Sequence, residues 1–260
     1  MSYISREHAL TTCVNMKSFY SGIASHFKDF GIDIESNRGR RNILMSEPME
    51  SFLATALSTT LHNVDSDGRT GKADIVITSE DGVETELECK LTSPHTSSGT
   101  ITFQTDFETL EKKGSIDYIY IVADETFDKF CAIYFKGLTV NDFRDISPGA
   151  RGKVQMYKHR GMKKATMLLG MAIDINEVSM AKYKVNHDLK ITVIEEKIKS
   201  LEDRLSRLRE TQVYVRNKTE NSIAIARNVL SKKINKFNKD IIIKSERTSR
   251  YTYKFESLEK

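Results

Sequence analysis

The sequence predicts an α/β fold in which a mixed β-sheet is flanked by helices and followed by a helical C-terminal region. Three patterns support this prediction. Apolar residues recur at helical spacing before residue 63, short runs typical of strands lie between residues 72 and 135, and a seam of coiled-coil spacing begins at residue 191. Strands interleaved with helices are typical of α/β domains.

The composition is that of a folded chain with its own core. Of the 260 residues, 39% are hydrophobic and 29% are charged, and only three are proline, which excludes collagen-like and disordered classes. No window approaches the roughly eighteen apolar residues of a membrane span, so we expect neither a span nor a signal peptide. The cysteines are odd in number and far apart, which indicates buried thiols in a reducing cytoplasm: Cys13, Cys89 and Cys131.

Two helices are expected before the strands. The apolar spacing predicts a first helix that ends near Gly31. Residues 37–41 (NRGRR) are then expected to form a basic loop. Ser46 is a good N-cap, so we expect the second helix over residues 46–63 with Pro48 in its first turn.

A β-hairpin is expected next. Residues 72–78 and 83–91 have strand character and are joined by Ser-Glu-Asp-Gly, in which Asp-Gly is a strong hairpin signal. Residues 104–112 are expected to form a helix, and residues 116–123 and 130–135 buried strands.

The hairpin gathers acids and a lysine. Side chains alternate along a strand, so one face of the second strand carries Glu84, Glu86, Glu88 and Lys90. Asp74 on the first strand falls opposite Glu88 or one diagonal step away, which places two carboxylates within about 5 to 8 Å. A bound Mg²⁺ would relieve their repulsion, and Lys90 would offset the rest. Metal-dependent phosphodiester hydrolysis uses such a set, and an exposed hairpin with a charged outer face is the alternative.

These residues carry a family resemblance. The stretches GKADIVIT and ETELECK, with Asp74, thirteen intervening residues and then Glu88-Cys89-Lys90, resemble the bipartite motif of the PD-(D/E)XK nuclease superfamily, particularly Type II restriction endonucleases. The resemblance spans residues 46–135, and Ala73 stands where the motif name has proline. It implies a restriction-endonuclease-like fold and Mg²⁺-dependent, site-specific hydrolysis of double-stranded DNA in a prokaryotic cytoplasm.

The resemblance also implies roles for single residues. Asp74 and Glu88 would bind Mg²⁺, the backbone carbonyl of Cys89 would complete the shell, and Lys90 would orient or polarise the attacking water. Many members carry a further glutamate on the preceding helix, and Glu50, at the edge of the buried stripe, is the candidate here. The alternative for Glu50 is an ordinary first-turn acid favoured by the helix dipole.

Candidate DNA contacts lie in two basic segments. Residues 151–164 (RGKVQMYKHRGMKK) hold six Lys or Arg, one His and no acid, and residues 37–41 hold three Arg. Solvated basic loops are the alternative. A glutamine after the motif touches a phosphate or the catalytic lysine in some relatives, although a surface polar role is the alternative. The candidates are Arg38, Arg40, Arg41, Gln104, Arg151, Lys153, Lys158, Arg160, Lys163 and Lys164.

The C-terminal third leaves two arrangements open. Residues 191–208 form the coiled-coil seam and residues 220–237 a second helical stretch. The seam pairs either between two chains or within one chain. We expect a catalytic domain over residues 1–180, a helical region for dimerisation or DNA contact over residues 181–260, and a homodimer, because a two-fold enzyme matches a palindromic site.

Other functions stay open at this point. A repair, recombination or modification-dependent nuclease would use the same chemistry, and a non-catalytic DNA-binding or coiled-coil assembly protein would not use it. The sequence contains no phosphate-cradling glycine loop and no zinc-type Cys/His cluster, so we expect no nucleotide cofactor.

Overall fold

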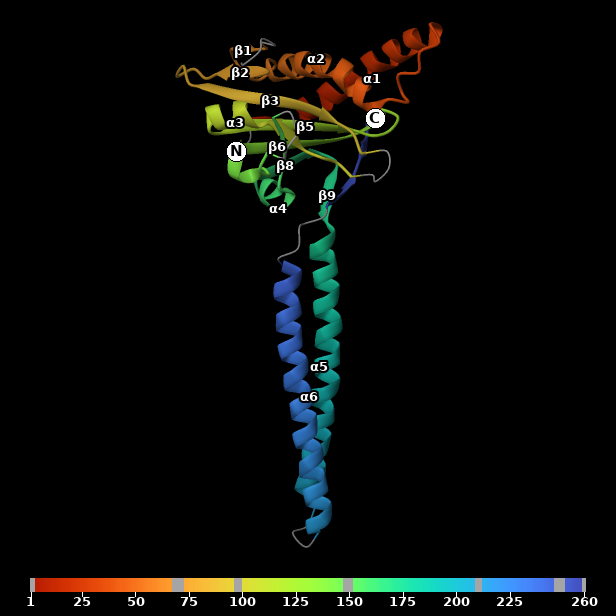
Figure 1. The fold of residues 1–260 in the computed structure, drawn as a ribbon, viewed down its shortest axis with the longest axis vertical. Helices are drawn as coiled ribbons and strands as arrows, with labels where there is room; N and C mark the ends of the chain where they lie inside the picture. The colour runs from red at the N-terminus through yellow and green to blue at the C-terminus, as the bar shows by residue number, and fades with distance from the viewer. Residues whose placement is uncertain are drawn as a thin grey trace. The chain divides into compact units, whose positions relative to one another are not determined.

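The chain divides into two compact units. A computed structural model describes residues 3–66, 73–95, 100–146, 152–208, 212–245 and 251–258, without the side chains of residues 176, 179 and 241–245 (Figure 1). The first unit comprises Met1–Ile173 and Tyr251–Lys260, and the second comprises Asp174–Arg250. The expected boundary at residue 180 therefore lies a few residues earlier, and the last residues belong to the first unit, because they form strands there.

A mixed β-sheet forms the centre of the first unit. Among the described residues its strands follow the order β1 (Val64–Asp65), β2 (Ile75–Thr78), β3 (Glu84–Thr92), β5 (Ile116–Ala123), β6 (Lys129–Leu138) and β11 (Glu256–Ser257), and β8 (Ala165–Leu169) also pairs with β6. The pairs β2–β3 and β5–β6 are antiparallel, whereas β3–β5 is parallel. Helices flank this sheet, which confirms the predicted α/β class.

Each face of the sheet has its own core. Helices α1 (Arg6–Asp29) and α2 (Arg38–Leu57) cover one face, and α3 (Phe107–Lys113) lies on the other with the short strand pair β4 (Gln104–Asp106) and β7 (Lys153–Gln155) (Figure 1). Along β5, Ile119 and Ile121 enter the first core, and Tyr118 and Tyr120 enter the second. The chain also forms helix α4 (Lys158–Gly161) and the 3₁₀ turns Val140–Asp142 and Met162–Lys164. Val140 and Met162 pack against the second core.

The first helix forms where the sequence predicts it. The Ser5 side chain accepts a hydrogen bond from the backbone N–H of His8, and the His8 side chain accepts one from Ser5, so the helix start is capped on both sides. Gly31 follows the helix with a φ of 73°, a conformation that glycine adopts without strain. The three cysteines are free and buried, as expected.

The second helix begins eight residues before its expected start. Asn37 caps it by accepting from the backbone N–H of Arg40, so the expected basic loop at residues 37–41 is wrong. Ser46 lies inside the helix and donates to the carbonyl of Asn42. Pro48 also lies inside it and removes a hydrogen bond to the carbonyl of Leu44, whose side chain is exposed.

The expected helix over residues 104–112 is shorter and follows a strand. Gln104–Asp106 forms β4, which pairs with β7, and Asp106 then caps α3 by accepting from the backbone N–H of Thr109. The pairing partner lies about fifty residues further along the chain, so no local pattern indicates it.

The second unit is an antiparallel pair of long helices, α5 (Ile175–Arg207) and α6 (Val213–Ser245). Ile198 and Ile223 are buried between them, the rings of His187 and Phe237 stack at 3.7 Å, and Arg227 forms a 2.7 Å ion pair with Glu202. The seam of residues 191–208 therefore packs within the chain, and the homodimer stays a prediction.

Arg41 fastens α2 to two loops at the edge of the sheet. Its side chain is fully buried and donates to the carbonyls of Asp124 and Glu125 at 2.8 and 2.6 Å and to the Ser93 hydroxyl at 3.0 Å. Its guanidinium also lies 5.0 Å from the centre of the Phe127 ring. These contacts leave no surface of Arg41 for DNA, so the DNA contact predicted for it is incompatible with the structure.

Replacing Arg41 is expected to destabilise the first unit. Arg41→Gln removes a charged donor from buried acceptors and should lower the free energy of unfolding by about 3 kcal/mol in urea titrations. Arg40→Gln, one residue earlier and exposed, should stay within about 0.5 kcal/mol of the wild type. Equal losses in the two variants would contradict the fastening role.

Candidate active site

The hairpin places the predicted acids across from one another. Ile75 pairs with Leu87 in the antiparallel register of β2 and β3, and one further step along that register sets Asp74 opposite Glu88. The turn between the strands contains Gly82 with a φ of 74°, which suits glycine and closes the hairpin. Leu87 and Cys89 enter the first core, so Glu88 and Lys90 lie on the other face of β3.

The three predicted catalytic side chains come together. The Lys90 amine lies 2.6 Å from Glu88 Oε1 and 3.6 Å from Asp74 Oδ2, and the backbone N–H of Cys89 donates to Asp74 Oδ2 at 2.7 Å. The side chains of Asp74, Glu88 and Lys90 retain only 20%, 16% and 32% of their exposure. The amine thus lies between two carboxylates that are largely removed from water.

Burial and mutual charge shift the titration of this group. Burial raises the pKa of Glu88, and Asp74 raises it further, while Lys90 opposes both. Burial alone would lower the pKa of Lys90, but Glu88 and Asp74 outweigh it, so its pKa is raised and the amine stays charged. One oxygen, Glu88 Oε2, is buried without a hydrogen-bond partner within the described structure.

Glu50 belongs to the same electrostatic group. It lies in the middle of α2 and not in the first turn, so the helix-dipole explanation for an acid there no longer applies. Burial, followed by the charges of Asp74 and Glu88, raises the pKa of Glu50 to about 7, although Lys90 lowers it. An acid this strongly perturbed beside two others is typical of a functional site.

The donor set suits a hard divalent cation. Asp74 and Glu88 offer carboxylate oxygens, and Glu88 Oε2 has no other partner among the described residues. The N–H and C=O of one strand residue point to the same side, so the Cys89 carbonyl lies on the side of Asp74. Within the described ranges no three His, Cys, Asp or Glu side chains form a metal-binding group. Mg²⁺ commonly uses one or two carboxylates and keeps several waters, which matches this pair.

A small cavity opens onto this group. It measures about 280 Å³, and its lining includes Glu88, Lys90, Gln104, Tyr120 and Lys153. The Tyr120 hydroxyl donates to the Gln104 carbonyl at 2.7 Å and so fixes β4 beside the site. Gln104 and Lys153, both predicted to contact DNA, therefore line the same cavity as the catalytic candidates.

Sequence reasoning missed Tyr120 at the cavity. Its signal is the parallel register of β3 and β5, which pairs Glu88 with Tyr118 and Lys90 with Tyr120. That register depends on contacts between strands that the sequence does not reveal, although strand alternation alone places both tyrosines on one face.

The remaining basic candidates differ in their surroundings. Arg38 forms a 2.8 Å ion pair with Glu125, and Lys164 forms one of 2.7 Å with Asp142, so both have partners inside the protein. Arg40 and Lys163 are exposed, and Arg151 lies outside the described residues.

Two other cations lie beside aromatic rings. The guanidinium of Arg160 is 4.7 Å from the centre of the Tyr157 ring, and the amine of Lys158 is 6.0 Å from that of Tyr253. Burial and the charge of Arg144 lower the pKa of Lys158. Among the described residues Lys158 forms no ion pair with an acid that would offset its burial, and such a cation suits an anionic ligand better than plain solvent.

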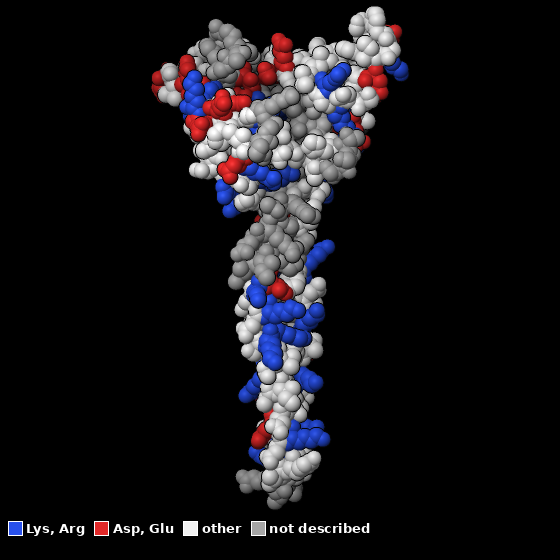
Figure 2. Space-filling model, viewed as in Figure 1, with Lys and Arg blue, Asp and Glu red and all other residues white. Residues whose placement is uncertain are grey.

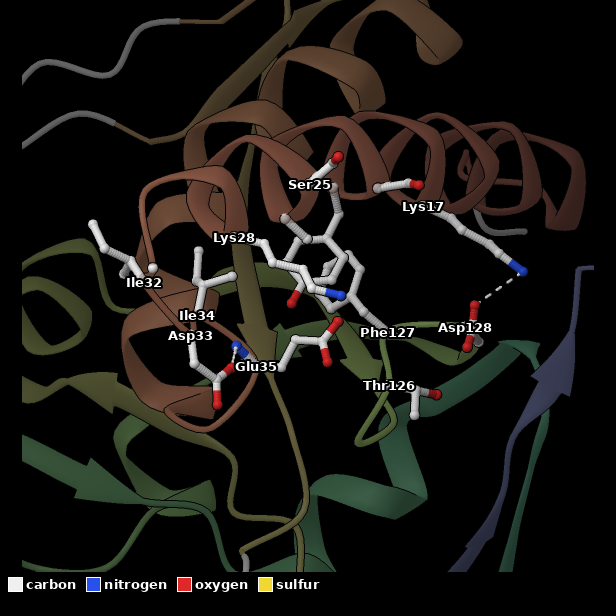
Figure 3. Close-up of a pocket in the computed structure, with 14 residues that line it drawn as sticks. Lys17, Ser25, Lys28, Ile32, Asp33, Ile34, Glu35, Thr126, Phe127 and Asp128 are labelled. Carbon is white, nitrogen blue, oxygen red and sulfur yellow. Dashed lines mark hydrogen bonds and ion pairs between the residues drawn. The ribbon is translucent and has the colours of Figure 1, made fainter.

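A larger cavity lies elsewhere. It measures about 870 Å³ and lies between α1 and two loops, at residues 31–35 and 126–128 (Figure 3). Lys17 and Lys28 line it together with Asp33, Glu35 and Asp128, and Lys17 forms a 3.2 Å ion pair with Asp128. Mixed charges of this kind do not favour a polyanion, and none of the catalytic candidates lines the cavity.

The pKa of Glu50 predicts a pH-dependent stability difference. From its ordinary value of 4.5 up to about 7, the unfolded chain releases this proton while the folded protein keeps it, so stability falls as pH rises through that window. Glu50→Gln should therefore gain about 1 to 2 kcal/mol relative to wild type between pH 4 and pH 8 without metal, allowing for solvent screening. Urea titrations at both pH values measure this, and Glu47→Gln, exposed on the same helix, should show no such gain.

Metal binding should be visible without any substrate. Mg²⁺ at about 100 times its Kd is expected to add roughly 2.7 kcal/mol of stability to the wild type. The double variant Asp74→Asn, Glu88→Gln should lose this gain, which a thermal melt with and without Mg²⁺ would record. Glu86→Gln on the same strand serves as the control and should keep it. An equal Mg²⁺ effect in all three proteins would place the metal elsewhere.

Comparisons with known proteins show no family for this chain. No protein-family model matches the sequence, and neither curated proteins nor solved structures give a significant match. Among the described helices, none has the length and apolar character needed to cross a membrane.

Proposed function

We propose that this chain is a Mg²⁺-dependent endonuclease that hydrolyses phosphodiester bonds in double-stranded DNA at a specific sequence, as Type II restriction endonucleases of the PD-(D/E)XK superfamily do. The observation that carries the proposal is the Lys90 amine placed between the carboxylates of Asp74 and Glu88 on one hairpin. The spacing of these residues in the sequence and the cavity beside them support it.

Each side chain has a role that its surroundings support. Asp74, Glu88 and the Cys89 carbonyl would hold Mg²⁺, which supplies a lowered water pKa and stabilises the charge that develops on the phosphate. Lys90 stays protonated and donates hydrogen bonds, so it would orient the attacking water and offset negative charge. Glu50, with a pKa of about 7, is suited to exchange a proton with that water near neutral pH.

The cavity residues would position the DNA. Gln104 and Lys153 lie at the cavity with Lys90, where a phosphate next to the cleaved bond would lie. Lys158 and Arg160 follow β7 in the chain and add positive charge. A repair or modification-dependent nuclease would use the same core, and the pattern of cleavage on plain plasmid separates the two activities.

Loss of the Lys90 amine should abolish cleavage and spare binding. Lys90→Ala is expected to reduce the cleavage rate by at least about 10²-fold, since it removes a charge-stabilising donor from a largely buried site. Plasmid incubated with Mg²⁺, followed by sequencing of the ends, measures activity, and fluorescence anisotropy on a duplex measures binding.

A matched control lies at the end of helix α3. Lys113 forms a 2.7 Å ion pair with Glu86 outside the cavity, so Lys113→Ala removes a comparable amine and should leave cleavage intact. Discrete bands from plain plasmid support site-specific cleavage. No cleavage by the wild type on any duplex, or full activity in Lys90→Ala, would overturn the proposal.

A further inference from the structure

One half of the helical hairpin is unusually rich in lysine. The Tyr183 hydroxyl donates to Asp240 at 2.7 Å and His187 stacks on Phe237, so the start of α5 lies level with the end of α6. Residues 180–194 and 230–240 contain two acids and seven exposed lysines, and we call this region the lysine-rich half. The lysines are Lys182, Lys184, Lys190, Lys232, Lys233, Lys236 and Lys239. Figure 2 shows basic side chains along both helices of this unit, with few acidic ones between them.

The acids of this region do not neutralise the lysines. Asp240 accepts from Tyr183, and Asp188 lies 3.6 Å from the ring of His187. Within the part of the chain that the structure describes, none of the seven lysines forms an ion pair. The other half of the hairpin differs, because there Arg227 pairs with Glu202 at 2.7 Å.

Three of the lysines form a single stripe. Lys232, Lys236 and Lys239 recur at steps of four and three, so they share one face of α6. Ile223 and Phe237 mark the face that packs on α5, and at about 100° per residue the three lysines fall on the opposite face.

This stripe is unfavourable to the isolated hairpin. Like charges at such spacing repel one another across one helical turn. The helix dipole favours cations only in the last turn, and α6 continues to Ser245, well beyond Lys232 and Lys236. A polyanion that bound along the stripe would turn this repulsion into attraction.

We propose that the lysine stripe of α6 binds the phosphate backbone of double-stranded DNA, as a second contact surface separate from the catalytic cavity. This inference rests on the proposed function for its choice of polyanion. An acidic membrane is the less favoured partner, because a helix that lies in a membrane inserts a continuous apolar face, and Ile223 and Phe237 of α6 already pack against α5.

The test compares two triple variants in the full-length protein. Lys232→Gln, Lys236→Gln, Lys239→Gln neutralises the stripe, and Lys197→Gln, Lys199→Gln, Lys218→Gln makes the same charge change in the other half of the hairpin. Binding to a random-sequence duplex is measured by fluorescence anisotropy without Mg²⁺ over a range of salt concentrations. Circular dichroism verifies that both variants keep their helices, which we expect because none of the six lysines forms an ion pair with another described residue.

Three lost phosphate contacts have a defined signature. The slope of log K against log salt should fall in magnitude by about 2 to 3 in the stripe variant, and the affinity at low salt should fall at least about tenfold. The control variant should change the slope by less than about 1. Equal slopes in the stripe variant and wild type would overturn the inference, as would equal losses in both variants or binding of the wild type to acidic phospholipid vesicles but not to DNA.

Failure of this inference is distinguishable from failure of the proposed function. If the wild-type protein cleaves plasmid and the stripe variant keeps the wild-type slope of log K against log salt, only the inference about the lysine stripe is refuted. If the protein never cleaves DNA but its binding to duplex depends on the lysine stripe, only the proposed nuclease function is refuted.

Discussion

A single ammonium group shared by two carboxylates is the interaction on which the candidate site depends. Asp74 and Glu88 are largely buried, and the charge of Asp74 adds to the burial that raises the pKa of Glu88. The Lys90 amine offsets both charges and is itself held in its charged form by them. The arrangement exists only in one register of β2 on β3, because a slip by one residue would turn Glu88 and Lys90 into the apolar core. The hairpin turn and the core residues between these side chains thus determine the chemistry available at the cavity.

The surroundings of a buried cation indicate whether its role is structural or chemical. Arg41 is fully buried, and its guanidinium donates to two carbonyls and a hydroxyl of neighbouring loops, an arrangement that stabilises the fold. Lys164 is likewise occupied by Asp142. Lys90 differs in where it lies, because it lines the cavity together with its partner Glu88, one oxygen of which is buried without a hydrogen bond in the described structure. Arg41 Nε is also buried without a partner in the described structure, but the Arg41 side chain has no exposed surface, whereas Glu88 and Lys90 line a cavity and are positioned to take part in binding.

The sequence predicts the parts of this structure that local pattern determines. Strand alternation and the Asp-Gly turn are local, so the opposition of Asp74 and Glu88 followed from them and the structure has it. The start of α2 was misplaced because Asn37 and Ser46 are both good caps, and tertiary packing decides between them. The burial of Arg41 rests on acceptors that are 52 to 84 residues away in the chain, so NRGRR alone looks like a solvated loop. The pairing of β4 with β7 and the return of β11 to β6 escape prediction for the same reason.

The intrachain packing of α5 on α6 changes how the C-terminal third contributes to function. Its apolar seam is used within one chain, so that seam gives no support to a dimer. The hairpin still presents to solvent both apolar side chains, such as Val185, Leu189 and Val193, and charge, and in one half that charge is lysine with little acid nearby. Charge on exposed helices supplies affinity that does not depend on base sequence, while discrimination between sequences needs preorganised groups in contact with the bases. Under the proposed function, these two requirements would divide the work between the units: the helical unit would supply non-specific DNA affinity, and the unit that contains the sheet, the hairpin and its cavity would supply both the chemistry and the sequence discrimination.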